Sequence, residues 1–516
     1  MIRVDWRVSC RLVGTVLKWL WVPLALPLGI ALLDETGTIL EANPALPLCV
    51  ALVDGSARLP FVVPMAGTAA LGVGLERLTG RSDLRAREAF LMVSLTWLGV
   101  AVVGAAPFVI AGQGTLAAPV NALFESMSGI TTTGATVVVD FDRHSRAILL
   151  WRALLQWLGG LGILVLATAI FSQLSVGGAQ LMETESQTGD SNRLTPRISE
   201  TATLLGKLYL GLTALQVTVL YGLHLVGLAP EMTLYDAVAH AFTTISTAGF
   251  SPRADSIAAF SPTVQWAIIP FMILGATSFV LIYFALRGNV DRLRESDEFR
   301  FYVGVLAFFA VVVAAVETAD ATYGSVEAVA RHSLFQVVSI VTTTGYASTD
   351  FNLWSSSAKH LLFVCMFIGG MAGSTTCSIK TLRWLIVLKA FRRDLFVAAQ
   401  PSAVRPIRLS GDVVDEETVR DVYAYTLVSI VIFILATMLV VVDASRVGLD
   451  ITEFEAMGAA ASTFFNVGPA FGIAGPFASY APFPRSTKLA MTFLMWIGRI
   501  EIIPVFVLLT PSYWRA

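Results

Sequence analysis

Four short turns, each ending in a glycine, are the residues in this sequence whose types and spacing could do chemistry. They read Ser128-Gly-Ile-Thr-Thr-Thr-Gly134, Thr243-Thr-Ile-Ser-Thr-Ala-Gly249, Ser339-Ile-Val-Thr-Thr-Thr-Gly345 and Thr463-Phe-Phe-Asn-Val-Gly468. Glycine reaches backbone dihedrals that a Cβ forbids, so successive carbonyls of such a turn can point the same way. A ring of carbonyl oxygens can replace the hydration shell of a cation. A single turn of this kind could be a helix cap or an ordinary loop, but four at equivalent places favour one shared role.

Charged residues also lie inside apolar runs, where an ionised side chain is costly. An arginine or carboxylate at the centre of a membrane helix costs at least about 2.5 kcal/mol on insertion scales, so it normally faces the protein interior. Arg499 and Glu501 occupy such positions in the last run, and their alternative role is a packing pair that satisfies each other or nearby carbonyls. Arg152 lies near the outer end of its run, where we expect it to extend to the membrane surface. Glu125 is expected to be structural.

The composition places this chain in a membrane. Hydrophobic residues make up 55% of 516 positions and charged residues 14%, whereas soluble domains are about a quarter charged. The four cysteines form no C-x-x-C pair, which argues against a disulfide framework or a structural zinc site. The net charge of −2 indicates no nucleic-acid partner. The first apolar run has no clear cleavage site after it, so we expect it to be retained.

The sequence does not predict an enzyme. It contains neither a P-loop nor a dinucleotide-binding fingerprint. His240 and His332 precede two of the turns, but neither has a partner His or a Gly-x-Ser-x-Gly-type context. We therefore expect a transport function, with no cofactor bound by this chain and a cation as the substrate.

Ten apolar runs have spanning or near-spanning length. They cover residues 12–33, 59–75, 89–111, 148–171, 204–228, 264–286, 301–316, 361–387, 422–442 and 489–509. The second run is the weakest, because it is short and contains Pro60 and Pro64. Most of the 35 Lys and Arg residues fall on one side of these runs. This asymmetry and the even number of runs predict that both termini are cytoplasmic.

A shorter stretch before each glycine turn predicts a helix that enters the membrane and turns back. These stretches are residues 119–130, 234–245, 326–341 and 454–465, all too short to cross a bilayer. The expected fold class is an all-α integral membrane protein with four helix–pore-loop–helix repeats in pseudo-fourfold arrangement and two extra N-terminal transmembrane helices. The expected divisions are 1–85 for the extension and 86–180, 181–295, 296–400 and 401–516 for the repeats.

The eighth run is interrupted by Gly369-Gly370-Met-Ala-Gly373-Ser-Thr-Thr-Cys-Ser378. Glycines and hydroxyls in the middle of a span disfavour a straight helix and favour a loop that lines a cavity. A helix kinked for tight packing is the alternative interpretation.

Together these segments resemble the Trk/Ktr/HKT superfamily of cation transporters, and most closely the TrkH-type pore subunit of bacterial potassium uptake systems. The resemblance rests on seven segments in the family's order: residues 124–136, 157–167, 196–202, 240–251, 335–348, 367–383 and 498–515. The two extra N-terminal runs favour the TrkH type over the shorter Ktr type. Thr376-Cys377-Ser378 departs from the family, which usually has a run of glycines there.

The resemblance implies a gated potassium pore in a bacterial cytoplasmic (inner) membrane. The implied potassium ligands are the backbone carbonyls before the filter glycines Gly134, Gly249, Gly345 and Gly468, namely those of Thr132, Thr133, Thr247, Ala248, Thr343, Thr344, Asn466 and Val467. The implied gate comprises Gly370, Gly373, Ser374, Thr375, Lys380 and Arg499, with the arginine repelling cations. Sodium-preferring relatives tend to have Ser at the first filter glycine, so Gly134 favours potassium.

The resemblance also implies partners. Family members form homodimers in the lipid bilayer and dock on cytoplasmic regulatory subunits of the TrkA type, which bind NAD(H) or adenine nucleotides. A sodium- or proton-coupled carrier of potassium or sodium is the alternative function. Many carriers are built from inverted repeats, whereas each repeat here begins and ends on the same side, which favours a pore.

Overall fold

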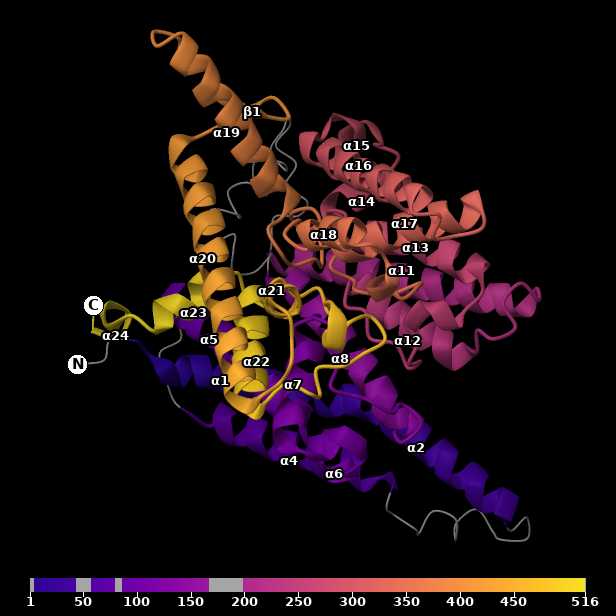
Figure 1. Ribbon diagram of the computed structural model, residues 1–516. Helices are drawn as coiled ribbons and strands as arrows, with labels where there is room; N and C mark the ends of the chain where they lie inside the picture. The colour runs from indigo at the N-terminus through magenta and orange to yellow at the C-terminus, as the bar shows by residue number, and fades with distance from the viewer. Residues whose placement is uncertain (1–3, 43–56, 79–85, 167–197, 516) are drawn as a thin grey trace.

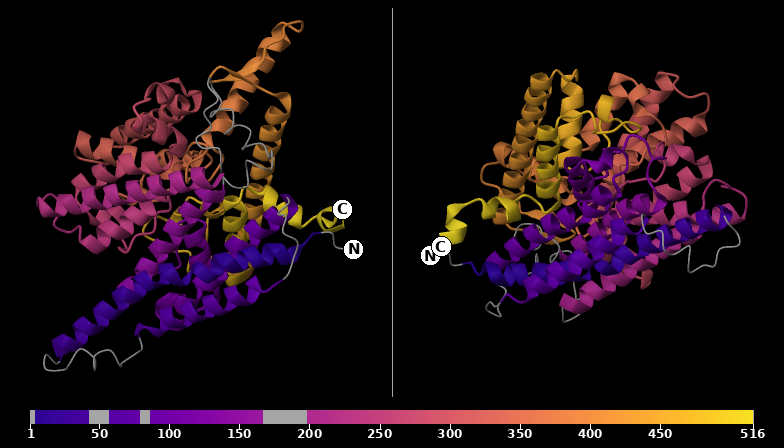
Figure 2. Two further views of the ribbon diagram at one scale, coloured as in Figure 1. Left: turned by 180° about the vertical axis from the view of Figure 1, so that it is seen from behind. Right: turned by 90° about the horizontal axis from the view of Figure 1, so that it is seen from below.

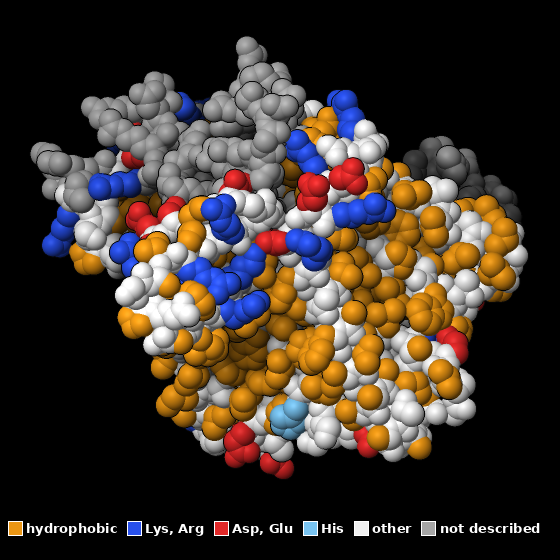
Figure 3. All heavy atoms as spheres, turned by 90° about the horizontal axis from the view of Figure 1, so that it is seen from above, with side chains coloured by type: hydrophobic (Ala, Val, Ile, Leu, Met, Phe, Trp, Pro, Cys, Tyr) orange, Lys and Arg blue, Asp and Glu red, His pale blue; other side chains and the backbone are white. Residues whose placement is uncertain are grey.

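The computed structural model describes residues 4–42, 57–78, 86–166 and 198–515, and this part of the chain is mainly helical (Figure 1). Seven of the described helices are long and apolar enough to cross a membrane, and one bent pair makes an eighth. A space-filling view shows a broad hydrophobic area on one face, bordered by a band of Lys and Arg side chains (Figure 3). The expectation of a multi-pass helical membrane protein is confirmed.

The N-terminal extension consists of α1 (Trp6–Trp19), α2 (Trp21–Ala42) and α4 (Leu59–Glu76). Helices α1 and α4 cross closely, because a Cβ on Gly14 or Gly72 would lie within 3.0 Å of the opposite helix. An ion pair of 2.9 Å between Lys18 Nζ and Glu76 Oε2 joins the same two helices. The second apolar run, expected to be the weakest, is a continuous helix. The first is divided at Leu20 into two helices that together give a span from Trp6 to Glu35.

A long helix opens each of the four modules that follow. These helices are α5 (Ala86–Gly104) with its continuation α6 (Ala106–Ala111), α11 (Ile198–Leu225), α16 (Asp297–Ala319) and α20 (Glu416–Val447). On α20, the apolar residues Leu427, Leu435 and Met438 are 63%, 60% and 59% exposed. Such a surface is stable in contact with lipid, since the bilayer core is as apolar as the side chains.

The four short helices are α7 (Pro119–Ile130), α12 (Leu234–Ile245), α17 (Val326–Val341) and α21 (Glu453–Phe464). The first three have the predicted ends, and α21 lies one residue earlier than predicted. Sequence chemistry explains where they begin. Side chains of Thr233, Ser325 and Thr452 accept a hydrogen bond from the first turn of their helices, while α7 begins with a proline, which suits a first helical position.

The helix after each glycine turn is continuous in the first module, where it is α8 (Arg146–Leu166), and broken in the other three. The broken pairs are α13 (Pro262–Gly275) with α14 (Phe279–Leu286), α18 (Ser356–Cys365) with α19 (Thr381–Ala399), and α22 (Arg485–Arg499) with α23 (Ile503–Leu508). Helices α13 and α14 meet at 105°. The break in the eighth run was expected. The sixth and tenth runs, which were expected to be single spans, are also broken.

Two of the breaks stabilise each other, because their backbone groups form hydrogen bonds across the interior. The residues between α18 and α19, which we call the intramembrane loop (residues 366–380), pack against the break between α13 and α14. Met371 N donates to Ala276 O at 2.9 Å, and Phe279 N donates to Gly373 O at 3.1 Å. Backbone that leaves a helix at membrane depth needs such partners. The segment is an unwound loop of fifteen residues by its bounds, so the kinked-helix alternative is wrong.

A small hairpin lies beyond α19 and departs from the all-α expectation. Strands β1 (Ile407–Leu409) and β2 (Asp412–Val414) pair antiparallel around Ser410 and Gly411, which both have positive φ. Two such residues are typical of a tight hairpin turn. The remaining short elements are η2 (Gly114–Ala117), η4 (Ser256–Ala259), α15 (Asp291–Glu295), η5 (Phe351–Leu353), η6 (Gly472–Ala474) and α24 (Pro511–Arg515).

The two ends of the described chain lie side by side at one edge of the molecule in all three views (Figures 1 and 2). Val4 and Tyr513 belong to one hydrophobic cluster there, and Tyr513 Oη donates to Arg87 O at 2.7 Å. The expected divisions after 295 and 400 fall at helix ends, whereas those at 85 and 180 lie outside the described residues. The division into repeats stays a prediction.

Candidate functional site

The four glycine turns share one backbone conformation. Their glycines all have positive φ, of 82° at Gly134, 81° at Gly249, 77° at Gly345 and 106° at Gly468. The residue two positions earlier is left-handed as well, with φ of 53°, 51°, 52° and 56° at Thr132, Thr247, Thr343 and Asn466. A β-branched residue rarely adopts this conformation. The sequence analysis named these residues as implied ligands but did not predict their left-handed backbone, although the asparagine at the fourth site, which tolerates that conformation, was a usable signal.

The left-handed residues arise from the way the short helices end. In every turn, the N–H of the residue before the glycine bonds to a carbonyl five positions earlier, as in Thr133 N to Ser128 O at 2.9 Å. The equivalent bonds of Ala248, Thr344 and Val467 are also 2.9 Å long. This is the Schellman ending, in which the residue just past the helix is left-handed and usually Gly or Asn. Each helix end therefore fixes the start of its turn.

The four turns contact each other in a closed ring. A Cβ built on each glycine would lie within 3.0 Å of a carbonyl oxygen on the next turn, in the order Gly134 to Ala248, Gly249 to Thr344, Gly345 to Val467 and Gly468 to Thr133. The carbonyl oxygen always belongs to the residue before the next glycine. The fourth turn contacts the first, which closes the ring. The space for a side chain is therefore already filled by backbone, which explains why glycine stands at all four places.

Side chains behind the ring brace single turns and link two of them to each other. Hydroxyl pairs join Thr131 to Thr133 and Thr342 to Thr344, each at 2.8 Å. The amide of Asn466 donates to Thr133 Oγ1 at 2.8 Å and so links the fourth turn to the first. These small polar groups satisfy one another in an interior without bulk water.

One carbonyl in the ring already has a side-chain partner. Gln156 on α8 donates from Nε2 to Ala248 O at 2.7 Å and accepts from Phe250 N at 3.0 Å through Oε1. A carbonyl has two lone pairs, so Ala248 keeps one for another ligand. The second turn is thus held from α8 by an amide clamp.

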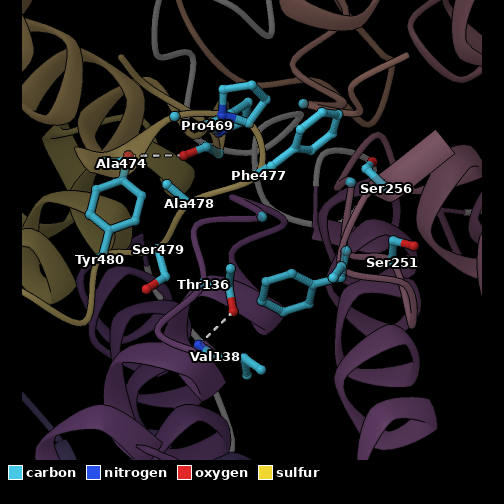
Figure 4. A pocket seen from close by; sticks show the side chains of 18 of the residues that line it. Thr136, Val138, Ser251, Ser256, Pro469, Ala474, Phe477, Ala478, Ser479 and Tyr480 are labelled. Atoms are coloured by element: carbon cyan, nitrogen blue, oxygen red, sulfur yellow. Dashed lines mark hydrogen bonds between the residues drawn. The ribbon is translucent and has the colours of Figure 1, made fainter. Parts of the chain in front are cut away.

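A pocket opens onto one side of the ring. All four glycines line it, together with residues that follow the turns, among them Thr136, Ser251, Pro469 and Tyr480. Figure 4 shows these side chains around the pocket, contributed by segments from different modules. The hydroxyl of Thr136 accepts from Val138 N at 3.0 Å, and Tyr480 Oη donates to Gly468 O at 2.9 Å.

The intramembrane loop contacts the second and third turns. Thr375 Oγ1 lies 3.1 Å from Thr247 Oγ1 and within hydrogen-bond distance of Gly275 O, at 2.9 Å. The backbone N–H of Cys377 donates to Thr343 Oγ1 at 3.2 Å. The loop is therefore bonded to the side chains of two left-handed residues of the ring.

Arg499 is fully buried at the end of α22, with 2% exposure, and fastens the loop to α8. Its Nη1 donates to Thr375 O at 2.8 Å and to Cys377 Sγ at 2.9 Å, and its Nη2 donates to Gly159 O at 3.0 Å. All three partners are neutral groups. Among the described residues, no carboxylate forms an ion pair with Arg499, and Glu501 pairs with Arg383 instead. A buried guanidinium that is held only by neutral groups leaves its positive charge uncompensated in this part of the interior.

Glu501 does not pair with Arg499. Its Oε2 accepts from Arg383 Nη2 at 2.5 Å, and the Arg383 guanidinium stacks 3.8 Å from the ring centroid of Tyr425. The backbone between α22 and α23 is left-handed at Glu501 and Ile502, which turns the two charges apart. The alternative that Arg499 and Glu501 satisfy each other is therefore wrong. The alternative that Arg499 bonds to nearby carbonyls is what the structure shows.

The other residues of the implied gate belong to the same loop. Gly370 is tightly enclosed, since a Cβ there would meet Ala276 O within 3.0 Å. Gly373 has a φ of 76°, and Ser374 Oγ donates to Met371 O at 2.6 Å. Lys380 stands just before α19, where its carbonyl accepts from Arg383 N at 2.9 Å. All of the loop residues named for the gate are thus brought together with Arg499.

Arg152 does not extend to the membrane surface. It is 1% exposed, and its Nε donates to Glu125 Oε1 at 2.7 Å. The expectation of an extended side chain is wrong, because a buried carboxylate on α7 gives the guanidinium a partner at that depth. The expectation that Glu125 is structural agrees with this contact.

The fold and the ring define a polytopic membrane protein in which four short helices end at glycine turns that contact each other. Comparison with known proteins agrees: residues 68–515 match the family model TrkH, described as a cation transport protein. The chain belongs to the TrkH family of cation transporters. It is 37% identical over 462 residues to the Trk system potassium uptake protein TrkH of Halomonas elongata, which covers 88% of this chain and 92% of that protein.

Two further relatives extend the comparison. The Trk system potassium uptake protein TrkH of Escherichia coli K12 is 35% identical over 439 residues, covering 84% of this chain and 87% of that protein. The crystal structure of the potassium transporter TrkH from Vibrio parahaemolyticus superposes with a TM-score of 0.84 at 30% identity, covering 99% of this chain and all of that one. The expected resemblance is confirmed, and the family is one of transporters.

Proposed function

We propose that this protein admits potassium ions to the cell through a gated pore, with the ring of glycine turns as its selectivity filter. The observation that carries the proposal is the closed ring, in which each turn's glycine accommodates a carbonyl of the next turn. Four backbone segments around one centre can surround a dehydrated cation with oxygens. The names of the relatives, which are potassium uptake proteins, support potassium as the substrate.

In this proposal the filter ligands are main-chain oxygens, two from each turn in a pseudo-fourfold arrangement. They belong to Thr132, Thr133, Thr247, Ala248, Thr343, Thr344, Asn466 and Val467. The four left-handed residues among them reverse the direction of the backbone just before the glycine, so successive carbonyls can face the same side. Because Ala248 also accepts from Gln156, its oxygen is the weakest ligand of the set.

The intramembrane loop and Arg499 form the gate of the proposed pore. The loop sits against two of the four turns and blocks the route below them, while the arginine adds a positive charge that disfavours a cation there. Opening requires the loop to leave Arg499. The other proposed gate residues, Gly370, Gly373, Ser374 and Lys380, shape the loop and its junction with α19.

The membrane potential supplies the driving force. At about 2.3 kcal/mol per charge for each 100 mV, it supports roughly fifty-fold accumulation of a monovalent cation. Both termini lie in the cytoplasm in this proposal, which fits their position side by side. We further propose a homodimer in the inner membrane that docks on TrkA-type regulatory subunits, because the relatives are named as members of a Trk system.

Growth of a bacterium that lacks its own potassium uptake tests the proposal. Expression of the wild-type chain with its regulatory subunits should restore growth on low potassium, and Gly134→Ser should abolish or weaken rescue, because the added side chain meets Ala248 O. Gly67→Ser is the matched control, since Gly67 has open space around its Cβ position. Failure of well-expressed wild type to rescue growth contradicts potassium uptake. Flux that saturates with potassium concentration would favour the carrier alternative over the pore.

A further inference from the structure

The residue nine positions before each filter glycine differs in every module. These residues are Glu125, His240, Gln336 and Ala459, which precede Gly134, Gly249, Gly345 and Gly468. All four side chains are fully buried on the short helices. Glu125, His240 and Gln336 contact the segment by which the chain leaves its glycine turn, so they are placed to fix the far side of the ring.

In the first module this contact is ionic. Glu125 accepts from Thr136 Oγ1 at 2.8 Å and from Arg152 Nε at 2.7 Å through Oε1, and from Val137 N at 2.8 Å through Oε2. Both oxygens of the carboxylate are therefore bonded, and its exposure is 0%. Thr136 and Val137 are the second and third residues after Gly134, so the carboxylate holds the exit of the first turn directly.

Arg152 extends the contact to the second turn. Its Nη2 donates to Thr136 Oγ1 at 3.0 Å, and its Nη1 donates to Ser251 O at 3.3 Å. Its guanidinium carbon lies 4.1 Å from the ring centroid of Phe250. Phe250 and Ser251 directly follow Gly249, so the arginine bridges the exits of two neighbouring turns. Arg152 also lines the pocket above the ring.

The equivalent residues of the other modules make neutral contacts with their exits, and beyond the second exit the partly exposed Arg253 forms an ion pair of 2.7 Å with Asp236. His240 Nε2 lies 3.1 Å from Ser251 Oγ, and Gln336 Nε2 donates to Ser348 Oγ at 3.3 Å. Ala459 has no polar group, and Tyr480 bonds to Gly468 O in its place. Within the described residues, a buried ion pair behind the ring thus occurs only in the first module.

We propose that Glu125 and Arg152 are positioning residues that fix the spacing of the first and second glycine turns and thereby set the ion selectivity of the pore. The proposal rests on the proposed function of the ring as a filter. The pair spans the place where Gly134 meets the carbonyl of Ala248, which is one of the four ring contacts. When the Glu125–Arg152 pair is lost, the contact between Gly134 and Ala248 O relaxes, and the ring of carbonyl oxygens can contract around a smaller cation.

Removal of one partner would leave a buried charge unpaired, which is strongly destabilising. The test variant is therefore the double substitution Glu125→Gln with Arg152→Gln, which removes both charges and keeps polar groups at both places. Fluxes of rubidium, as a potassium substitute, and of sodium are measured in proteoliposomes. The sodium-to-rubidium flux ratio should rise about fivefold, the scale expected when one net hydrogen bond is lost, while rubidium flux stays within about threefold of wild type.

The matched control is the double substitution Lys18→Gln with Glu76→Gln, which removes an ion pair of 2.9 Å between α1 and α4, away from the ring. Its flux ratio should equal that of wild type. Arg152→Lys keeps the charge and loses the second arm of the fork, so we expect an intermediate ratio. A merely structural role would lower thermal stability without changing the ratio in any of these proteins.

Three outcomes are distinguishable. Wild type that passes no rubidium refutes the proposed function itself. If the wild type passes rubidium and the folded Glu125→Gln, Arg152→Gln variant has an unchanged flux ratio, only the positioning role of Glu125 and Arg152 is refuted. If the Gln/Gln variant does not fold, Thr136→Val decides, because it removes the hydroxyl between the two charged groups and leaves the ion pair intact. An unchanged ratio in that variant also refutes the positioning role.

Discussion

Replacement of Arg499 by alanine should raise basal ion flux, and the structure sets the size of the effect. When the intramembrane loop leaves, Arg499 loses its bonds to Thr375 O and Cys377 Sγ but keeps the one to Gly159 O on α8. Sulfur is a weak acceptor, so the bond to Thr375 O dominates. A hydrogen bond from a charged donor contributes about 1.5–3 kcal/mol.

Each 1.4 kcal/mol is a factor of about ten in an equilibrium constant. Loss of the Thr375 bond should therefore shift the closed-to-open ratio by about 10- to 100-fold, and water that solvates the guanidinium in the open state moves the value toward ten. Rubidium influx into proteoliposomes without regulatory subunits measures this shift. Arg331→Ala is the control, because Arg331 is also buried, at 7% exposure, but lies on α17 away from the loop.

Two more variants separate charge from tether. Arg499→Lys keeps the positive charge but loses the planar fork, whereas Arg499→Gln keeps a donor and loses the charge. Comparable flux through the Gln and Ala variants indicates that repulsion closes the pore, and comparable flux through Lys and Ala indicates that the tether does. A folded Arg499→Ala protein with unchanged or lower flux would refute the gating role of this residue.

Three other predictions follow from the same contacts. Gly249→Ala should abolish rubidium flux, because its Cβ would meet Thr344 O more closely than at any other turn, while Gly67→Ala should match wild type; equal flux in both would contradict the ring. Glu298→Ala should raise basal flux by about threefold, since Glu298 Oε1 accepts from Ala372 N at 2.7 Å and anchors the loop; unchanged flux would exclude this anchor. Thr132→Asn should raise the free energy of unfolding by about 0.5–1 kcal/mol, and with it the thermal midpoint, because asparagine suits a φ of 53°. A lower midpoint in a thermal melt would contradict backbone strain at Thr132.

The sequence predicts the re-entrant helices well. Three of the four have the expected ends, because the composition changes sharply from an apolar stretch to a glycine turn at residues 130, 245 and 341. The turns could be recognised because they recur. Recurrence is visible in a sequence even when no single copy is distinctive.

Other features depend on contacts that local patterns do not encode. The break at 276–278 falls at Thr277 and Ser278, and the break at 500–502 contains Glu501 next to Arg499, but polar residues at these places do not by themselves indicate that a helix ends. The first break forms backbone hydrogen bonds with the intramembrane loop of another module, and at the second the Glu501 side chain is bound by Arg383. Backbone sterics disfavour threonine in a left-handed conformation, and the hydrogen bonds that end the short helices impose it at Thr132, Thr247 and Thr343.

Arg152 shows a third limit of sequence reasoning. Depth in the membrane alone favoured an extended side chain, since a lone arginine there is costly. The partner, Glu125, is 27 residues away and lies on a different helix. Only the packing of α7 against α8 brings the two charges together.

The ring of glycine turns belongs to one polypeptide, so a codon change alters a single quarter of it. In a pore assembled from four identical subunits, every substitution is imposed four times at once. Here an amide at Asn466 and a methyl group at Ala248 stand where the other quarters have threonine or valine. A series of genes with one, two, three or four altered glycines can therefore count directly how many intact quarters an ion needs.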